Sequence, residues 1–211
     1  SSDLVLVGHS MGGVIARLMV SSTDQSLVQL VADDGRLTPQ QIKRIDSMLH
    51  FEPVPNVSSA IFIAAPHRGT SIAGGRLGRW MAGFIRFPIT MLEELAHTLA
   101  PNVAASSRES LGSMPNSVDN LDENDPFVRT AAGFPISSQV RYHSIVAQAD
   151  PQVALVDSDD GLVPYRSAHL PGAQSEKVIT SGHSVQQDAA AILEIQRILR
   201  KDMALRGECS T

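Results

Sequence analysis

The stretch from Leu4 to Ile15, LVLVGHSMGGVI, decides the fold class of this chain. Its first four residues form a short continuous apolar run, which is typical of a strand buried on both faces of a parallel sheet. Three glycines among residues 8–13 then predict a tight turn, and the apolar run at residues 14–20 predicts a helix. The sequence therefore predicts a strand, a sharp turn and a helix in immediate succession.

Apolar patterns in the rest of the chain continue this alternation. We expect further strands at residues 60–65, 140–147 and 177–180, and a helix at residues 39–49 that begins at a proline. The terminal helix, from residue 185 onward, is expected to bury the stripe formed by Ala189, Ile192, Ile195 and Leu199. Strands that alternate with helices indicate an α/β fold with a mostly parallel sheet.

Residues 70–137 contain no convincing strand. An apolar helical stripe runs through their first part, formed by Leu77, Trp80, Met81, Phe84 and Ile85. We therefore expect a helical insertion at residues 70–137, between two core segments at residues 1–69 and 138–211.

Composition bounds the possible partners. The chain has 211 residues, of which 43% are hydrophobic, and a net charge of −5, so it resembles a packed globular protein and lacks the basic balance of a nucleic-acid binder. Its single cysteine, Cys209, cannot form an internal disulfide, and Cys/His zinc spacings are absent. No apolar run approaches the roughly 18 residues that a transmembrane helix needs. We expect no nucleic acid, metal or bilayer-spanning segment.

Ser10 stands in a G-x-S-x-G pattern at residues 8–12. Such a match arises by chance in roughly one of nine chains with this composition, so its place between a strand and a helix is the stronger signal. A serine nucleophile on such a turn needs small residues, and we expect a side chain at Gly8 or Gly12 to collide with neighbouring backbone. The N–H of Met11, at the start of the helix, is the expected oxyanion donor. The alternative is a plain glycine turn with an exposed serine.

A serine nucleophile requires a histidine base, and in this architecture the acid and then the histidine follow the serine along the chain. Only His169 and His183 come late enough. His183 is favoured because it follows a strand at residues 177–180, whereas His169 looks like an exposed turn residue. His9 is expected to line the site or to pack beside it. Ser184 repeats the Gly-His-Ser triplet and is expected to cap the terminal helix.

The acid is harder to choose. Asp157, Asp159 and Asp160 share one loop, and their spacing to His183 does not separate them. A solvated acidic turn is the alternative, while a calcium loop of the EF-hand type is excluded by its register and by the missing glutamate.

Four segments, taken together and in order, resemble the α/β-hydrolase superfamily, in its branch of bacterial lipases and esterases. They are GHSMGG at residues 8–13, APHRGT at residues 65–70, DGLVP at residues 160–164 with the following Ser167-Ala168, and GHS at residues 182–184. The resemblance singles out Asp160 as the acid. It also implies that residues 70–137 form a lid or cap, whose Trp80, Met81, Phe84 and Ile85 either line an acyl pocket or pack the cap onto the core.

The activity that the resemblance implies is hydrolysis of a small-molecule or lipid ester through an acyl-enzyme, with Ser10, His183 and Asp160 as the triad. Acyl transfer or thioester cleavage on the same triad, and a non-catalytic binding module, are the alternatives. No cofactor is expected, and no metal, because Val185 stands where some bacterial lipases have a calcium-binding aspartate.

The same family has several strands before the serine turn, and one of their loops supplies a second oxyanion N–H. This chain begins at the strand that carries Ser10, which predicts a fragment or a partner polypeptide. We expect the 211 residues alone to be inactive and to self-associate or swap strands through an open sheet edge. The expected source is bacterial, and the sequence leaves the compartment open between the cytoplasm and the cell envelope.

Overall fold

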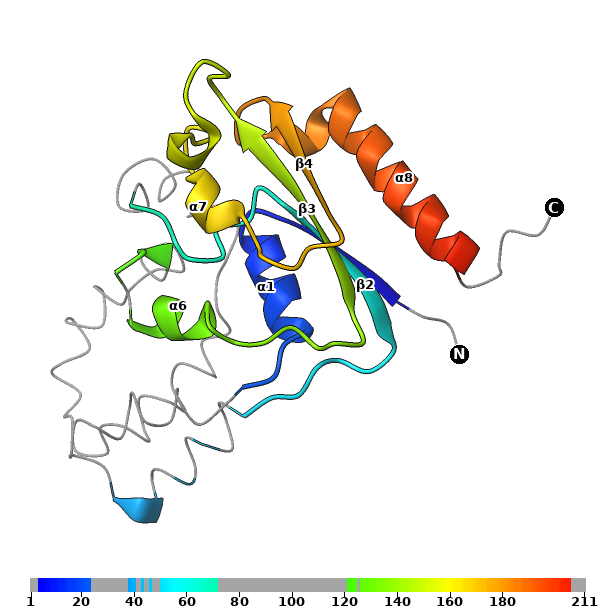
Figure 1. The fold of residues 1–211 in the computed structure, drawn as a ribbon. Coiled ribbons are helices and arrows are strands. Elements are labelled where there is room, and N and C mark those ends of the chain that lie inside the picture. Colours follow the sequence, from blue (N-terminus) through cyan, green and yellow to red (C-terminus); the bar gives the residue numbers. More distant parts are fainter. Residues whose placement is uncertain are drawn as a thin grey trace, which may run out of the picture.

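The computed structural model describes residues 4–23, 38–40, 43, 46, 50–71, 121–124 and 126–205. Four strands form one parallel sheet in the order β1-β2-β3-β4 (Figure 1). The strands are β1 (Leu4–His9), β2 (Val57–Ile63), β3 (Arg141–Gln148) and β4 (Ser175–Thr180). All run the same way, so the loops that follow them meet at one edge of the sheet. The predicted α/β class is confirmed.

Helices cover both faces of this sheet. The helical elements are α1 (Met11–Met19), α6 (Pro126–Ala131), η5 (Leu155–Asp157), α7 (Tyr165–Ala168), η6 (Val185–Gln187) and α8 (Ala189–Leu205). Successive residues of β2 serve different faces: Phe62 packs in the cluster that contains Ala16 of α1, and Ile61 in the cluster that contains Ile198 of α8. In Figure 1, α1 and α8 accordingly lie on opposite sides of the sheet.

The edge strand β1 is less buried than its apolar sequence predicts. Leu4 is 49% exposed and Val7 is 50% exposed. Val7 pairs with Ile61 and thus points to the face that α8 covers, but the core cluster on that face contains no residue of β1. The prediction that β1 is buried on both faces is therefore wrong for the described residues, because α8 packs on the other three strands.

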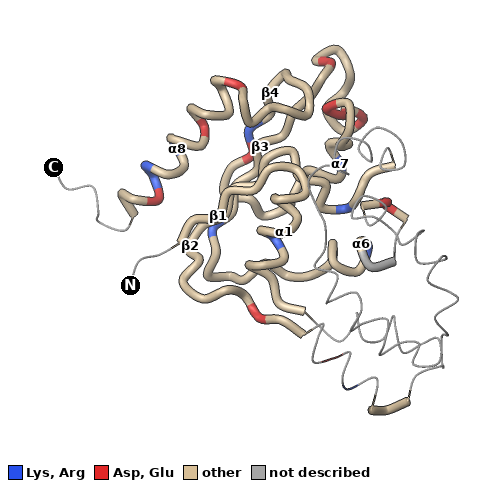
Figure 2. The backbone as a smooth tube through the Cα atoms, turned by 180° about the vertical axis from the view of Figure 1, so that it is seen from behind, with Lys and Arg blue, Asp and Glu red and all other residues tan. Residues whose placement is uncertain are grey.

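The buried stripe of α8 also differs from the prediction. Ile195 and Leu199 pack against the core as expected, but Ala189 and Ile192 are exposed, and Ala191 and Ile198 take their place. Figure 2 shows acidic and basic residues interspersed along this helix, where Glu194 and Arg197 form an ion pair at 2.6 Å.

The start of α8 is capped by a residue that the sequence did not suggest. Ser184 makes no side-chain cap. Instead, the Asp188 carboxylate accepts a hydrogen bond from the N–H of Ala190 at 2.8 Å. The prediction that Ser184 caps α8 is wrong, because a short turn, η6, separates it from the helix.

Parts of the predicted insertion fall outside the described residues. Of the predicted helix at residues 39–49, the described positions 39, 40, 43 and 46 are helical. The predicted insertion at residues 70–137 is described only at residues 70–71, 121–124 and 126–137, and α6 lies in the last of these segments. The apolar stripe with Trp80, Met81, Phe84 and Ile85 lies outside the described residues. Among the helices that are described, none is both long and apolar enough to span a membrane.

Candidate active site

Ser10 forms the sharp turn between β1 and α1. Its backbone has φ 54° and ψ −127°, a region that costs a non-glycine residue about 1–3 kcal/mol. The surroundings hold it there: its N–H donates to the carbonyl of Ile63 at 2.9 Å, and its own carbonyl accepts the N–H of Gly13 at 2.9 Å. The strained turn is thus fixed by β2 on one side and by α1 on the other.

The glycines of this turn do not contribute equally. A Cβ built on Gly8 would lie 2.4 Å from the carbonyl oxygen of Gly12, and one on Gly13 would lie 2.4 Å from the Cβ of Ala65. A Cβ on Gly12 would meet nothing within 4 Å. The expectation of a collision is therefore right for Gly8 and wrong for Gly12, because the second close approach is made by Gly13 against the loop after β2.

This difference predicts a contrast in stability between two neighbouring alanine variants. Gly13→Ala is expected to lower the free energy of unfolding by about 1–3 kcal/mol, because its methyl group overpacks against Ala65. Gly12→Ala is expected to leave it unchanged or raise it by up to about 1 kcal/mol, since alanine favours a helix. Urea denaturation of both variants measures the contrast. Equal losses would contradict the assigned packing.

Three side chains from different loops meet at Ser10. His183 Nε2 lies 2.8 Å from Ser10 Oγ, and His183 Nδ1 lies 2.8 Å from Asp160 Oδ2. All three residues are buried, with 2%, 7% and 4% of their surface exposed for Ser10, His183 and Asp160. Since a carboxylate only accepts, Nδ1–H donates to Asp160, and Nε2 accepts from the hydroxyl of Ser10. The arrangement is a Ser-His-Asp relay.

The other oxygen of Asp160 is held by backbone. Asp160 Oδ1 accepts hydrogen bonds from the N–H groups of Leu162 at 2.9 Å and Val163 at 2.7 Å. Both donors lie in the same loop as the carboxylate, which therefore turns back on its own chain. The loop leaves Oδ2 alone to face His183.

The candidates that spacing left open differ in their contacts. Asp159 accepts the N–H of Gly161 at 2.7 Å, and Asp157 is exposed in η5. The ring of His169 contacts Glu176, with Nδ1 2.7 Å from the carboxylate. Asp160 thus contacts His183, and His183 contacts Ser10. Asp159 and His169 have the other partners just named.

His9, beside the serine, contacts the histidine loop. Its Nε2 lies 2.8 Å from the backbone carbonyl of His183, and the two rings have centroids 5.1 Å apart. Burial lowers the pKa of His9 below its ordinary value, so the ring is neutral at pH 7 and donates through Nε2–H. His9 therefore binds the main chain of the residue whose side chain faces Ser10.

Met11 is the first residue of α1. The first N–H groups of a helix have no acceptor within it, and the positive end of the helix dipole lies there. Negative charge that develops beside Ser10 would face this helix end.

Among the described residues, no group of His, Cys, Asp or Glu side chains is arranged to hold a metal ion.

His67 is a buried titratable residue whose role the sequence did not reveal. It is 2% exposed, packs edge-to-face on Phe62 at 5.0 Å, and neither ring nitrogen has a hydrogen-bond partner within the described part of the chain. Burial, reinforced by Arg17 and Arg68, holds its pKa well below the ordinary 6.5. The ring is therefore neutral in the folded protein.

A buried neutral histidine makes stability fall in acid. The unfolded chain takes up the proton near pH 6.5 while the folded chain does not, so stability is lost as the pH falls below 6.5, by up to about 1.4 kcal/mol per pH unit. His67→Phe is expected to flatten this loss between pH 7 and pH 5, and the exposed-site control His50→Gln is not. Denaturant unfolding at each pH measures it. A His67→Phe variant as acid-sensitive as the wild type would contradict the assignment.

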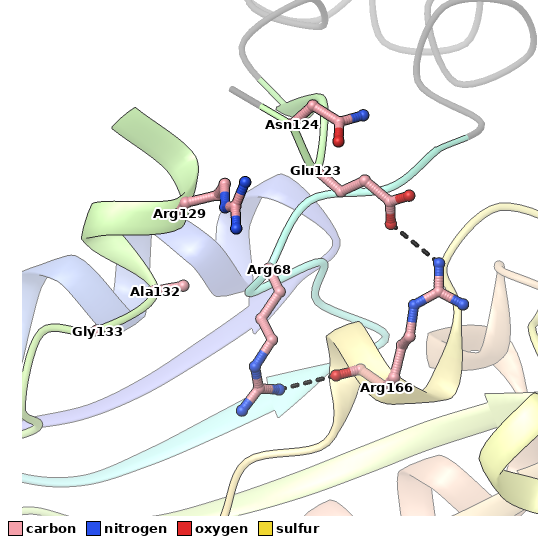
Figure 3. Close-up of a pocket in the computed structure, with 7 residues that line it drawn as sticks. All are labelled: Arg68, Glu123, Asn124, Arg129, Ala132, Gly133 and Arg166. Carbon is pink, nitrogen blue, oxygen red and sulfur yellow. Dashed lines mark hydrogen bonds and ion pairs between the residues drawn. The ribbon is translucent and has the colours of Figure 1, made fainter. Parts of the chain in front are cut away.

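A polar cavity lies beside α6 and α7, separate from the relay (Figure 3). Its lining residues are Arg68, Glu123, Asn124, Arg129, Ala132, Gly133 and Arg166. Arg166 pairs with Glu123 at 3.0 Å, and Arg68 donates to the backbone carbonyls of Arg166 and His169. These contacts give Arg68 and Arg166 structural partners, and none of the three relay residues lines the cavity.

A family model described as the alpha/beta hydrolase family matches residues 1–195. Among solved structures, the mature lipase BlEst2 of Bacillus licheniformis is 16% identical with a TM-score of 0.46, over 93% of this chain and 65% of that one. The lipase of Staphylococcus hyicus is 14% identical with a TM-score of 0.45, over 99% and 72%. Lipase 1 from Pelosinus fermentans is 16% identical with a TM-score of 0.39, over 86% and 65%. No curated protein matches.

Proposed function

Because the chain belongs to the alpha/beta hydrolase family, we propose that it hydrolyses carboxylic esters through an acyl-enzyme formed on Ser10. The observation that carries the proposal is the pair of 2.8 Å contacts that join Ser10 Oγ, the His183 ring and the Asp160 carboxylate. A buried serine in a strained turn, with a neutral imidazole positioned to accept its proton, is the arrangement that nucleophilic catalysis needs.

Acylation begins when Ser10 Oγ attacks the ester carbonyl while His183 Nε2 takes the hydroxyl proton. The carbonyl oxygen becomes an oxyanion in the tetrahedral intermediate, and the N–H of Met11 donates a hydrogen bond to it. When the intermediate collapses, the bond to the alkoxy oxygen breaks and the imidazolium gives that oxygen its proton. The alcohol leaves, and the acyl group stays on Ser10.

Deacylation repeats these steps with water as the nucleophile. His183 Nε2 takes a proton from water as the water oxygen attacks the acyl carbonyl, and it then returns a proton to Ser10 Oγ as the carboxylic acid leaves. Asp160 stays ionised in both halves. Its hydrogen bond to Nδ1–H fixes the tautomer and stabilises the imidazolium.

The test uses the purified native protein, at the full length that its gene encodes, with a panel of p-nitrophenyl esters of increasing acyl length, the matching thioesters, and each ester with added alcohol. The proposal expects saturable ester hydrolysis with the free acid as the main product. Preferential thioester turnover or dominant transfer to the alcohol would overturn ester hydrolysis and favour a different acyl acceptor or donor on the same serine. Absence of all turnover would overturn the enzyme assignment and favour a binding module.

A further inference from the structure

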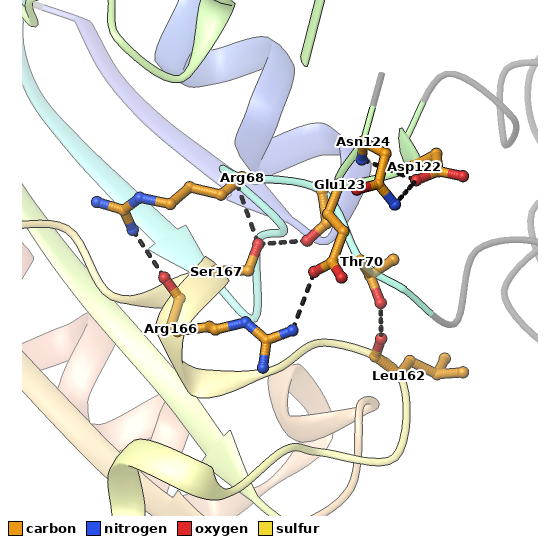
Figure 4. Close-up of polar contacts among 9 residues, drawn as sticks. Arg68, Thr70, Asp122, Glu123, Asn124, Leu162, Arg166 and Ser167 are labelled. Atoms are coloured by element: carbon orange, nitrogen blue, oxygen red, sulfur yellow. Dashed lines mark hydrogen bonds and ion pairs between the residues drawn. The ribbon is translucent and has the colours of Figure 1, made fainter. Parts of the chain in front are cut away.

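The loop that follows β2 is attached to the loop that carries Asp160. Thr70, which is fully buried, donates its hydroxyl proton to the backbone carbonyl of Leu162 at 2.6 Å (Figure 4). Leu162 is the residue whose N–H donates to Asp160 Oδ1 at 2.9 Å. One residue of the acid loop is therefore held at both ends, by the carboxylate through its N–H and by Thr70 through its C=O.

The bond from Thr70 is one of several between these two segments. Ser167 Oγ donates to the carbonyl of Gly69 at 2.5 Å and accepts the N–H of Arg68 at 3.1 Å, while its own carbonyl accepts the N–H of His67 at 3.1 Å. In Figure 4, Ser167 on α7 reaches the loop that follows β2, and Thr70 of that loop reaches back to Leu162. Among these contacts, the one from Thr70 lies nearest along the chain to Asp160.

The backbone of Thr70 is itself fixed. Its N–H donates to the carbonyl of Leu121 at 2.8 Å. The preceding Gly69 has φ +74°, and a Cβ there would lie 2.7 Å from the same carbonyl oxygen. A glycine at residue 69 thus lets the chain approach closely enough for the next residue to present its hydroxyl to Leu162.

We propose that Thr70 is a positioning residue for the relay: it fixes the acid loop so that Asp160 keeps its two backbone donors on Oδ1 and presents Oδ2 to His183. This inference rests on the proposed function. Without the hydroxyl, the carbonyl of Leu162 loses its donor, and the peptide that joins Leu162 to Val163 is free to turn. The N–H of that peptide belongs to Val163 and donates to Oδ1 at 2.7 Å, so it moves away from the carboxylate, which loses the orientation that holds the imidazole.

The test compares Thr70→Val, which keeps the shape and removes the hydroxyl, with Thr70→Ser, which keeps the hydroxyl. The Val variant is expected to lose about 10–100-fold in kcat, with KM within twofold of the wild type. Losing a hydrogen-bond partner that orients a functional side chain typically lowers activity on this scale. The Ser variant is expected to stay within threefold. Thr130→Val, on α6, controls for the substitution itself and is expected to retain full kcat.

Two further readouts separate positioning from general destabilisation. The downfield proton resonance of His183 Nδ1–H should weaken and shift upfield in Thr70→Val but persist in Thr70→Ser. The acidic limb of the kcat/KM profile should move to lower pH, because a misaligned carboxylate stabilises the imidazolium less. If Thr70→Val does not fold, Thr70→Ala tests the same bond.

A Val or Ala variant with wild-type kcat and an unchanged Nδ1–H resonance would overturn the inference. The resonance is measured without substrate, so it tests the positioning role even if esters are not turned over. Failure of the wild-type protein to hydrolyse any ester would instead overturn the proposed function.

Discussion

Ser10→Ala is expected to lower kcat for ester hydrolysis by about 10⁵–10⁶-fold, to the residual rate that binding and the oxyanion donor support. The variant removes the nucleophile and leaves the rest of the relay in place. Its fold should persist, because alanine fits the space of the serine and the N–H bond to Ile63 remains. Steady-state kinetics on the best ester of the panel, with far-UV circular dichroism on the same sample, measures both.

Ser184 provides the matched control. It occupies the same Gly-His-Ser context as Ser10, but it is exposed and lies in a turn before η6. Ser184→Ala is expected to keep wild-type kcat. If Ser184→Ala lost activity while Ser10→Ala kept it, the nucleophile would be misassigned.

Asp160→Asn is expected to lower kcat by about 10⁴-fold. The two N–H groups of Leu162 and Val163 that face Oδ1 require an oxygen there, so the side-chain NH₂ of asparagine must face His183. An NH₂ group donates to Nδ1 and drives the ring proton to Nε2, which then cannot accept the proton of Ser10. The free energy of unfolding should change little, because the backbone contacts of the loop remain.

Asp159→Asn is the control for this variant. Asp159 is the adjacent acid, and its carboxylate accepts the N–H of Gly161, which an amide oxygen would also accept. We expect its kcat within a factor of two of the wild type. Comparable losses in Asp159→Asn and Asp160→Asn would contradict the assigned acid.

Local sequence patterns were sufficient for the fold class and for two residues of the relay. The apolar run before Gly8 and the glycine turn after it specify a strand, a turn and a helix, and each of these is present around Ser10. His183 was singled out because it follows a strand, and the loops that follow parallel strands all lie at the carboxyl edge of the sheet. These signals depend on neighbours in the sequence.

The features that local patterns missed depend on residues far apart in the chain. Spacing alone could not distinguish Asp160 from its neighbours, because the choice is made by which side chain reaches His183, 23 residues later. Gly13 matters because of Ala65, and Thr70 because of a carbonyl 92 residues away. The exposure of Val7 likewise follows from which strands α8 covers.

The most direct test of the relay is covalent labelling with a fluorophosphonate, read out by the intact mass of the protein and then by peptide mapping. Ser10 should carry a single adduct, and the Ser10→Ala protein should carry none. The reagent reacts with a serine only where a base has activated it, so the measurement does not depend on knowing the natural substrate. An adduct on another serine, or labelling that persists at the same rate in Ser10→Ala, would contradict the account.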